Sequence, residues 1–325
     1  MKTLVRALRV AVVAAFAAGS MQLASAQALR LAHITPPTHI WHQVSEKVAA
    51  DLAQATNGSL RITVNPQARL GNEAQVINMM QAGAVQFSVL TVGALANREE
   101  SLLGWSLPYV FRDVAHAAQA TQTPAAREML NRLEASGLVG LGYTFAGMRH
   151  VLTLAPVAAP RDLAGKKVRV FPSPVFNDWW LAVGAAPTAM PLSEVAPSLM
   201  TRLLDGVDID LDALVGLRLY QQAPHLTLTN HMAFPGVFTV SKRWWDARSD
   251  AERATIRRVV DEALRWGVQA AIQAEASNLA QARTGGARVG EFNAAAFQAL
   301  AAPVRDRYTA RNPLIADFAR QVRAQ

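Results

Sequence analysis

Short apolar runs alternate with helix-like stripes through the first part of the chain. Leu29–His33 and Leu60–Val64 are β-favouring runs, and apolar residues recur every four positions across Gln43–Ala55 between them, which predicts a helix. A helix between two strands predicts a parallel pair joined by a right-handed crossover. Ligands of such sheets bind beyond the carboxyl ends of the strands, so we expect His33 and the loop after it to lie on the ligand side.

The same alternation continues to the end of the chain. The further strands predicted by β-favouring runs are Val85–Leu90, Leu138–Phe145, Lys167–Phe171 and Val207–Asp212. The further helices predicted by periodicity and cap residues are Asn72–Ala82, Pro124–Ser136, Glu194–Leu204, the long Asp250–Arg283 and closing helices within Glu291–Arg323. Strands that alternate with helices in this way indicate an α/β fold, and the length allows about two domains.

The segment Lys167–Glu194 carries the strongest candidate for binding chemistry. Ser173 is suited to cap a helix that begins at Pro174, and Gly184 suits the position just past its end. Arg169 lies inside the apolar strand before this helix, where a guanidinium is costly to bury without an anion. Its planar fork fits a carboxylate or a phosphate with two parallel hydrogen bonds. The anion is either an internal carboxylate or a bound ligand, and the pattern alone leaves both open.

Three carboxylates follow in the run Val207–Asp212. Its strict alternation places Asp208, Asp210 and Asp212 on one face if the segment is extended. Carboxylates that share a face repel one another, so these three either face water or meet hydrogen-bond donors.

The first 26 residues have the pattern of a secretory signal peptide. Basic residues precede the apolar run Val10–Ala18, which is too short to span a membrane, and Ala24–Ala26 offers a small-residue cleavage site. No other stretch approaches the roughly 20 consecutive apolar residues of a spanning helix. We therefore expect export to the periplasm and cleavage after about Ala26.

Composition and motifs exclude several classes of protein. The absence of cysteine excludes disulfides, thiol catalysis and cysteine-ligated metals. The formal net charge is +8, but the basic residues are scattered without interleaved aromatic residues, so we expect no nucleic-acid partner. Hydrolase, zinc-protease and phosphate-loop motifs are missing, and nothing indicates a cofactor. An acid–base pair could still occur among the Asp residues, so an exported α/β enzyme acting on a carboxylate substrate is the alternative.

Histidines near the start of the chain raise the question of a metal. His39 and His42 are three residues apart, and Glu46 follows four residues later. The proline-rich loop before them makes a shared helical face uncertain, and loop histidines usually serve as ordinary hydrogen-bonding groups. We therefore predict no metal site here.

Several segments resemble the solute-binding proteins of TRAP transporters, the DctP family. These are DLAGKKVRV, SPV, GAAPTAMPLSEV and LLDG, which follow one another between Asp162 and Gly206. The resemblance implies that Arg169 grips the carboxylate of an organic acid. Gly147-Met148-Arg149 resembles the family's G-x-R, which implies that Arg149 is a second basic contact. Pro66–Glu73 resembles the element P-x-x-x-LG-x-E, and a residue near that helix start, here Glu73, faces the cleft in relatives.

The chain departs from this resemblance after Asp205-Gly206. Many relatives read Q-E-N-P there, with the Asn on the ligand, whereas this chain has Asp208 and Ile209 at the Glu and Asn positions. A carboxylate, Asp208 or Asp210, would then accept from ligand hydroxyls and would repel a second acid group. This favours a hydroxylated monoacid, such as a sugar acid, over a C4-dicarboxylate.

The resemblance also implies an architecture and a partner. It implies a type II periplasmic binding protein fold, two α/β lobes with a cleft between them and a long helix spanning both. Lobe I would comprise residues 27–148 and about 238–277, and lobe II residues 149–237 and about 278–325. The lobes would close on the ligand by hinge motion, and the closed form, expected to be a monomer, would deliver the acid to TRAP membrane permease subunits.

Overall fold

The computed structural model describes residues 27–325, so the expected signal peptide lies outside the described residues. The strands are β1 (Gln27–Ala32), β2 (Leu60–Asn65), β3 (Phe87–Thr91), β4 (Leu138–Thr153), β5 (Lys167–Val170), β6 (Ala186–Ala189), β7 (Gly206–Asp210), β8 (His225–Thr227), β9 (Ala233–Ser241) and β10 (Arg288–Val289). The α-helices are α2 (Ile40–Ala55), α3 (Glu73–Gln81), α4 (Val92–Leu95), α5 (Val114–Ala120), α6 (Pro124–Arg132), α7 (Pro174–Val183), α8 (Val195–Met200), α9 (Leu211–Gly216), α10 (Lys242–Asp246), α11 (Asp250–Thr284), α12 (Ala294–Gln298), α13 (Ala301–Arg311) and α14 (Pro313–Arg323). None of the described helices is long and apolar enough to cross a membrane.

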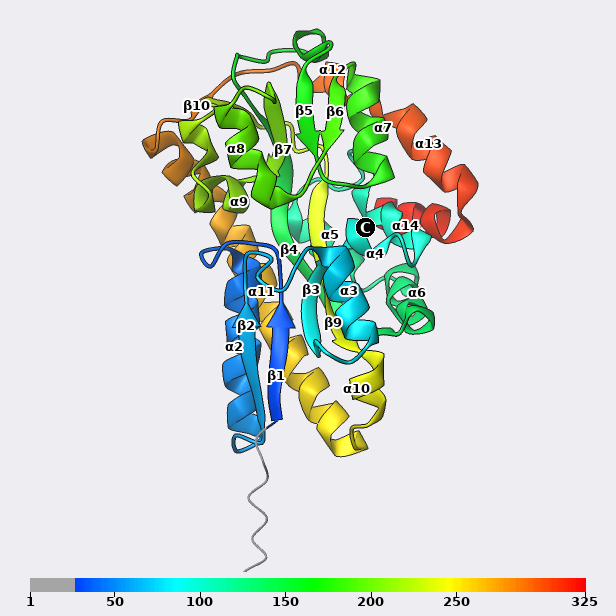
Figure 1. Cartoon of the computed structure of the whole chain (residues 1–325). Helices are drawn as coiled ribbons and strands as arrows, with labels where there is room; N and C mark the ends of the chain where they lie inside the picture. The colour runs from blue at the N-terminus through cyan, green and yellow to red at the C-terminus, as the bar shows by residue number, and fades with distance from the viewer. Residues whose placement is uncertain (1–26) are drawn as a thin grey trace, which may run out of the picture.

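One strand joins the two halves of the sheet. The strand order is β2-β1-β3-β9-β4-β7-β5-β6, and β4 pairs with β9 up to Met148 and with β7 from Arg149 onward. We call β1, β2, β3 and β9 with their helices lobe I, and β5 to β8 with α7, α8 and α9 lobe II; Figure 1 shows lobe I below lobe II. The β1–β2 pair is parallel, as predicted from the β-α-β pattern. The mixed two-lobed architecture confirms the expected fold class.

The long helix α11 runs past both lobes (Figure 1). Its start is fixed by a capping box, in which Ser249 accepts from the Glu252 N–H and the Glu252 side chain accepts from the Ser249 N–H. It packs against α2 and β4, and also against α9 of lobe II. The C-terminal segment, expected in lobe II, contacts both lobes, because α13 packs on α7 whereas α14 packs on α6.

Two element boundaries differ from prediction for reasons that bear on the site. Helix α2 begins three residues earlier than expected, because the His39 ring caps it by accepting from the Trp41 N–H at 3.1 Å. Strand β4 continues to Thr153, because Gly147 adopts a φ of +136° that permits an irregular step in pairing between Phe145 and Met148. Arg149 therefore lies on a strand and not in a surface loop.

Lobe II also contains shorter elements than predicted. Helix α8 ends at Met200, and Arg202, with a φ of +56°, begins the turn into β7. Strand β7 ends at Asp210, whose side chain accepts from the Ala213 N–H at 2.8 Å and caps α9. Asp212 therefore lies in the first turn of α9 and not on the strand, although its carboxylate and that of Asp210 both lie near His39.

Candidate functional site

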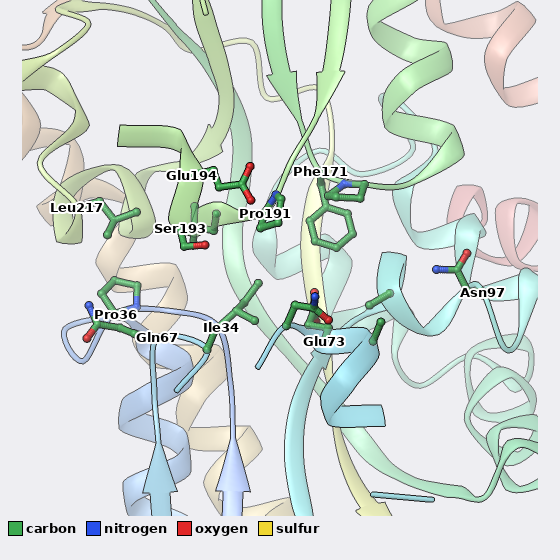
Figure 2. A pocket seen from close by; sticks show the side chains of 16 residues that line it. Ile34, Pro36, Gln67, Glu73, Asn97, Phe171, Pro191, Ser193, Glu194 and Leu217 are labelled. Atoms are coloured by element: carbon green, nitrogen blue, oxygen red, sulfur yellow. The ribbon is translucent and has the colours of Figure 1, made fainter. Parts of the chain in front are cut away.

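A cavity of about 730 Å³ lies between the lobes. Lobe I contributes Ile34, Pro36, Gln67, Ala68, Asn72, Glu73, Ala74, Ala94 and Asn97, and lobe II contributes Phe171, Pro172, Pro191, Leu192, Ser193, Glu194 and Leu217. Figure 2 shows Glu73 on the lobe I side and Phe171 and Glu194 on the lobe II side of this space. The lining combines apolar walls with amide, hydroxyl and carboxyl groups, which suits a small ligand that carries hydroxyls.

Arg169 lies in lobe II behind the residues that line this cavity, and is not itself one of them. It is on β5, two residues before the cavity-lining Phe171, and is 2% exposed. Its Nε and Nη2 both donate to the Met190 carbonyl, at 3.0 and 2.9 Å, and none of the described carboxylates forms an ion pair with it. Burial, together with the like charge of Arg149, lowers the pKa of Arg169 to about 9, so it remains a cation at neutral pH. It is a buried cation with none of the described carboxylates in contact, although the charges of Asp208, Asp210 and Glu73 act on it from farther away and partly oppose the fall in its pKa.

Arg149, by contrast, is fully engaged within the protein. It is 1% exposed, and its Nε donates to Asp208 at 2.6 Å, its Nη1 to Asp210 at 3.1 Å and its Nη2 to the Asp208 carbonyl at 2.5 Å. The guanidinium also lies 4.3 Å from the ring centroid of Phe234. The sequence allowed Arg169 either an internal carboxylate partner or a ligand, and the internal arginine–aspartate pair is formed by Arg149 instead.

Asp208 is surrounded by donors that sequence reasoning did not connect to it. Its Oδ2 accepts from the Trp180 indole N–H at 2.6 Å and lies 3.1 Å from the His231 Nε2. Burial alone would raise the pKa of Asp208, but Arg149 and His231 outweigh it and hold the pKa below its usual range. Asp208 is therefore a buried counterion for Arg149, and it does not line the cavity.

Asp210 and Asp212 lie against the start of α2 in lobe I. His39 lies 3.6 Å from Asp210 and 3.8 Å from Asp212, while the Ile40 N–H donates to Asp212 at 2.7 Å. Burial lowers the pKa of His39, but the two carboxylates outweigh burial and raise it. These contacts connect the two lobes at one end of the cleft.

Glu73 does line the cavity, although most of it is buried. It is the first residue of α3, 8% exposed, and accepts from the Thr91 N–H at 2.6 Å and the Thr91 hydroxyl at 3.0 Å. Burial raises its pKa to about 7 despite these bonds. Glu73 therefore holds the end of β3 in place as well as presenting a carboxyl edge to the cavity.

His33 does not line the cavity. Its Nδ1 lies 2.9 Å from the Thr35 hydroxyl and its Nε2 3.1 Å from the His42 Nδ1. Burial, followed by the charges of His39 and His42, lowers the pKa of His33 to about 3, so the ring is neutral near pH 7. None of the described residues form a group of three or more His, Asp or Glu that could hold a metal ion.

Other features of the site were not predicted. Four polar residues that line the cavity are Gln67, Asn97, Ser193 and Glu194. They lie in turns and at the ends of elements, where polar residues are common, so their type alone does not indicate a binding site. Ser173 lies just before α7, as expected, but its hydroxyl makes no cap hydrogen bond and is buried without a partner among the described residues.

Two α/β lobes around a cavity, with a buried guanidinium that has no ion-pair partner among the described residues and lies two residues from the cavity-lining Phe171, define a two-lobed solute-binding protein. The family model described as bacterial extracellular solute-binding protein, family 7 (DctP), matches residues 31–312, so the chain belongs to this family. Its members are periplasmic solute-binding subunits of transporters and not enzymes.

Named relatives support this assignment along most of the chain. The 2,3-diketo-L-gulonate-binding periplasmic protein of Escherichia coli is 29% identical over 77% of this chain and 75% of its own length. A C4-dicarboxylate-binding periplasmic protein DctP of Shewanella loihica is 26% identical over 74% of this chain and 71% of its own length.

Solved structures agree with the fold. A TRAP periplasmic solute-binding protein of Xanthobacter autotrophicus with bound β-D-galacturonate superposes with a TM-score of 0.87 and 28% identity, covering 91% of this chain and 99% of that one. One of Pseudomonas putida with bound D-glucuronate gives a TM-score of 0.86 and 26% identity, covering 92% and 97%.

Proposed function

We propose that this protein captures an organic acid in the cleft between its lobes, with Arg169 binding the carboxylate, and delivers it to a TRAP membrane permease. The observation that supports this most is the state of Arg169, a buried cation whose contacts are to a backbone carbonyl and not to a carboxylate. A buried charge left in this state is costly, and an incoming carboxylate would remove that cost while accepting two parallel hydrogen bonds.

The ligand we propose is a hydroxylated monocarboxylate of sugar-acid size. Glu73 and Glu194 both line the cavity, so a second carboxylate on the ligand would meet the Glu194 carboxyl and, above its pKa of about 7, the charge of Glu73. Ligand hydroxyls would instead find acceptors in these carboxyl groups and partners in Asn97 and Ser193. The relatives with bound galacturonate and glucuronate support this choice, whereas the C4-dicarboxylate-binding relative represents the competing class.

The remaining residues expected to bind ligand receive different proposed roles. We assign Arg149, Asp208 and Asp210 a structural role where β4 passes from lobe I to lobe II, because their charged groups are already paired with one another. Glu73 would accept from the ligand at the cavity edge, and His33 would act only through the loop it stabilises.

We place the mature protein in the periplasm as a monomer, with the signal peptide removed after about Ala26. The family supports a periplasmic location. The permease partner follows from the same membership, since members of the family serve transporters.

A thermal-shift screen followed by calorimetry tests the proposal. Uronates and aldonates should raise Tm more than succinate or malate, because a ligand that binds only the folded state stabilises it. Arg169→Ala should weaken binding of the best acid at least about 30-fold, since one partner of a buried charge pair is lost. Arg161→Ala, at an arginine whose side chain is 85% exposed, is the matched control and should bind normally. Undiminished binding by the Arg169 variant would reject the proposal.

A further inference from the structure

Two glycines lie where the lobes touch at the edges of the cavity. Gly93 is on α4 of lobe I, and Gly216 is the last residue of α9 in lobe II. The residues that follow them, Ala94 and Leu217, both line the cavity. Each glycine therefore faces the opposite lobe beside the space that would hold a ligand.

Gly93 leaves no room for a side chain. A Cβ atom there would lie 2.5 Å from Cε1 of Phe171 and 3.3 Å from Cβ of Ser173, both in lobe II. The Phe171 ring is buried and contacts the rings of Phe176 and Phe234, with centroids 5.9 and 5.6 Å away. Phe176 is on α7 of lobe II and Phe234 on β9 of lobe I, so the ring cannot turn aside without disturbing its packing against both.

The lobe I side of this contact is equally fixed. Thr91 caps α4 by accepting from the Ala94 N–H at 3.0 Å, and Glu73 in turn accepts from both the backbone and the hydroxyl of Thr91. The short helix that carries Gly93 is thus tied to α3 and cannot retreat from Phe171 on its own.

Gly216 makes the corresponding contact from the other lobe. Its Cβ would lie 2.7 Å from the Thr38 hydroxyl and 2.9 Å from Cγ of Pro36, in the loop between β1 and α2. The proline ring is rigid and lines the cavity opposite Leu217, as Figure 2 shows. A methyl group here would have to push the two lobes apart.

The glycines are not required by the backbone of their own helices. Both have ordinary negative φ values, because neither is among the glycines with a positive φ. Alanine is the better helix former, so a substitution should not harm either lobe by itself. The demand for glycine comes only from the lobe across the cleft.

We propose that Gly93 and Gly216 are positioning residues for ligand capture, which set how closely the lobes approach over the bound acid. Alanine at either position holds the lobes apart, so the ligand is bound by one lobe without full enclosure by the other. This inference rests on the proposed capture of an organic acid in the same cleft.

Titration of Gly93→Ala and Gly216→Ala with the best acid from the screen tests this. We expect Kd to rise about 10- to 100-fold, because the variants strain the described arrangement, in which the lobes are in contact. The dissociation rate should carry the change while the association rate stays within about twofold, and Tm without ligand should not fall. Gly290→Ala, at a glycine whose Cβ would meet nothing within 4 Å, is the matched control and should bind as the wild type does.

Interlobe distances provide a readout that does not need the acid. The chain has no cysteine, so Gln54→Cys on α2 and Lys166→Cys in lobe II would carry spin labels at only those positions. The glycine variants should lose the shorter interlobe distances of the wild type, with and without ligand. Variants with wild-type distances and affinity would overturn the inference, as would a fall in unliganded Tm. A wild type that binds no acid would instead reject the proposed function, and the distances of the unliganded proteins would still decide the role of the glycines.

Discussion

Arg149→Ala separates a structural role for this arginine from a role in ligand binding. The substitution leaves Asp208 and Asp210 buried without the cation that contacts both. Removal of one partner from a buried ion pair costs about 3–5 kcal/mol. The unfolding entropy of the roughly 300 residues of the mature chain is about 0.6 kcal/mol per kelvin near 60 °C, so Tm should fall by about 5–8 °C.

The loss should depend on pH with a definite sign. In the wild type Arg149 helps to hold the pKa values of Asp208 and Asp210 below their usual range, so this stability is present at neutral pH and is lost as pH falls through those values. Without the cation, burial favours the protonated carboxyls, so the stability of the variant increases relative to that of the wild type as pH falls. The Tm difference should therefore be largest near pH 7 and shrink toward pH 4.

Differential scanning calorimetry of ligand-free protein measures this difference. Arg149→Lys, which keeps the charge but not the fork, should lie between the wild type and the alanine variant. Arg161→Ala controls for loss of an exposed arginine. An Arg149→Ala protein with unchanged Tm across this pH range, but with weakened acid binding, would show that Arg149 serves the ligand and that the structural account is wrong.

Three further substitutions test other parts of the account. Burial raises the pKa of Glu73 from 4.5 to about 7, so the wild type loses stability as pH rises between these values. Glu73→Gln has no group to titrate there, so in calorimetry its Tm relative to wild type should increase across that window and stay level above it, and a constant Tm difference would contradict this. Gly147→Ala, at a φ of +136° and against the Glu275 carboxylate, should lower stability by about 1–3 kcal/mol in denaturant titration; no loss would contradict the irregular step in β4. Arg169→Lys should bind the acid much more weakly than wild type in calorimetry, and equal binding would rule out a bidentate contact.

Local chemistry made much of the fold predictable from sequence. The signals at the start and end of α7, Pro174 and Gly184, fixed that helix to the residue, and Gly184 adopts the expected left-handed φ of 94°. The burial of Arg169 followed from an isolated charge in an apolar strand. Capping residues and an isolated charge in a strand act on neighbouring residues, so their effects do not depend on the rest of the fold.

The partners of the buried charges could not be predicted in the same way. Arg149 meets Asp208 across 59 residues of chain and Asp210 across 61, through strands whose register depends on the step at Gly147. The sequence placed Arg169 inside an apolar strand and Arg149 beyond the end of one, and only the strand pairing shows that Arg149 receives the carboxylates. The polar lining of the cavity likewise depends on how two separate lobes approach each other.

Calorimetric titration with D-galacturonate and with D-galactose, its counterpart without a carboxylate, tests most directly whether Arg169 binds an organic acid. The wild type should bind the acid and not the neutral sugar, and Arg169→Ala should bind neither. Equal affinity of the wild type and the variant for the acid would contradict the account.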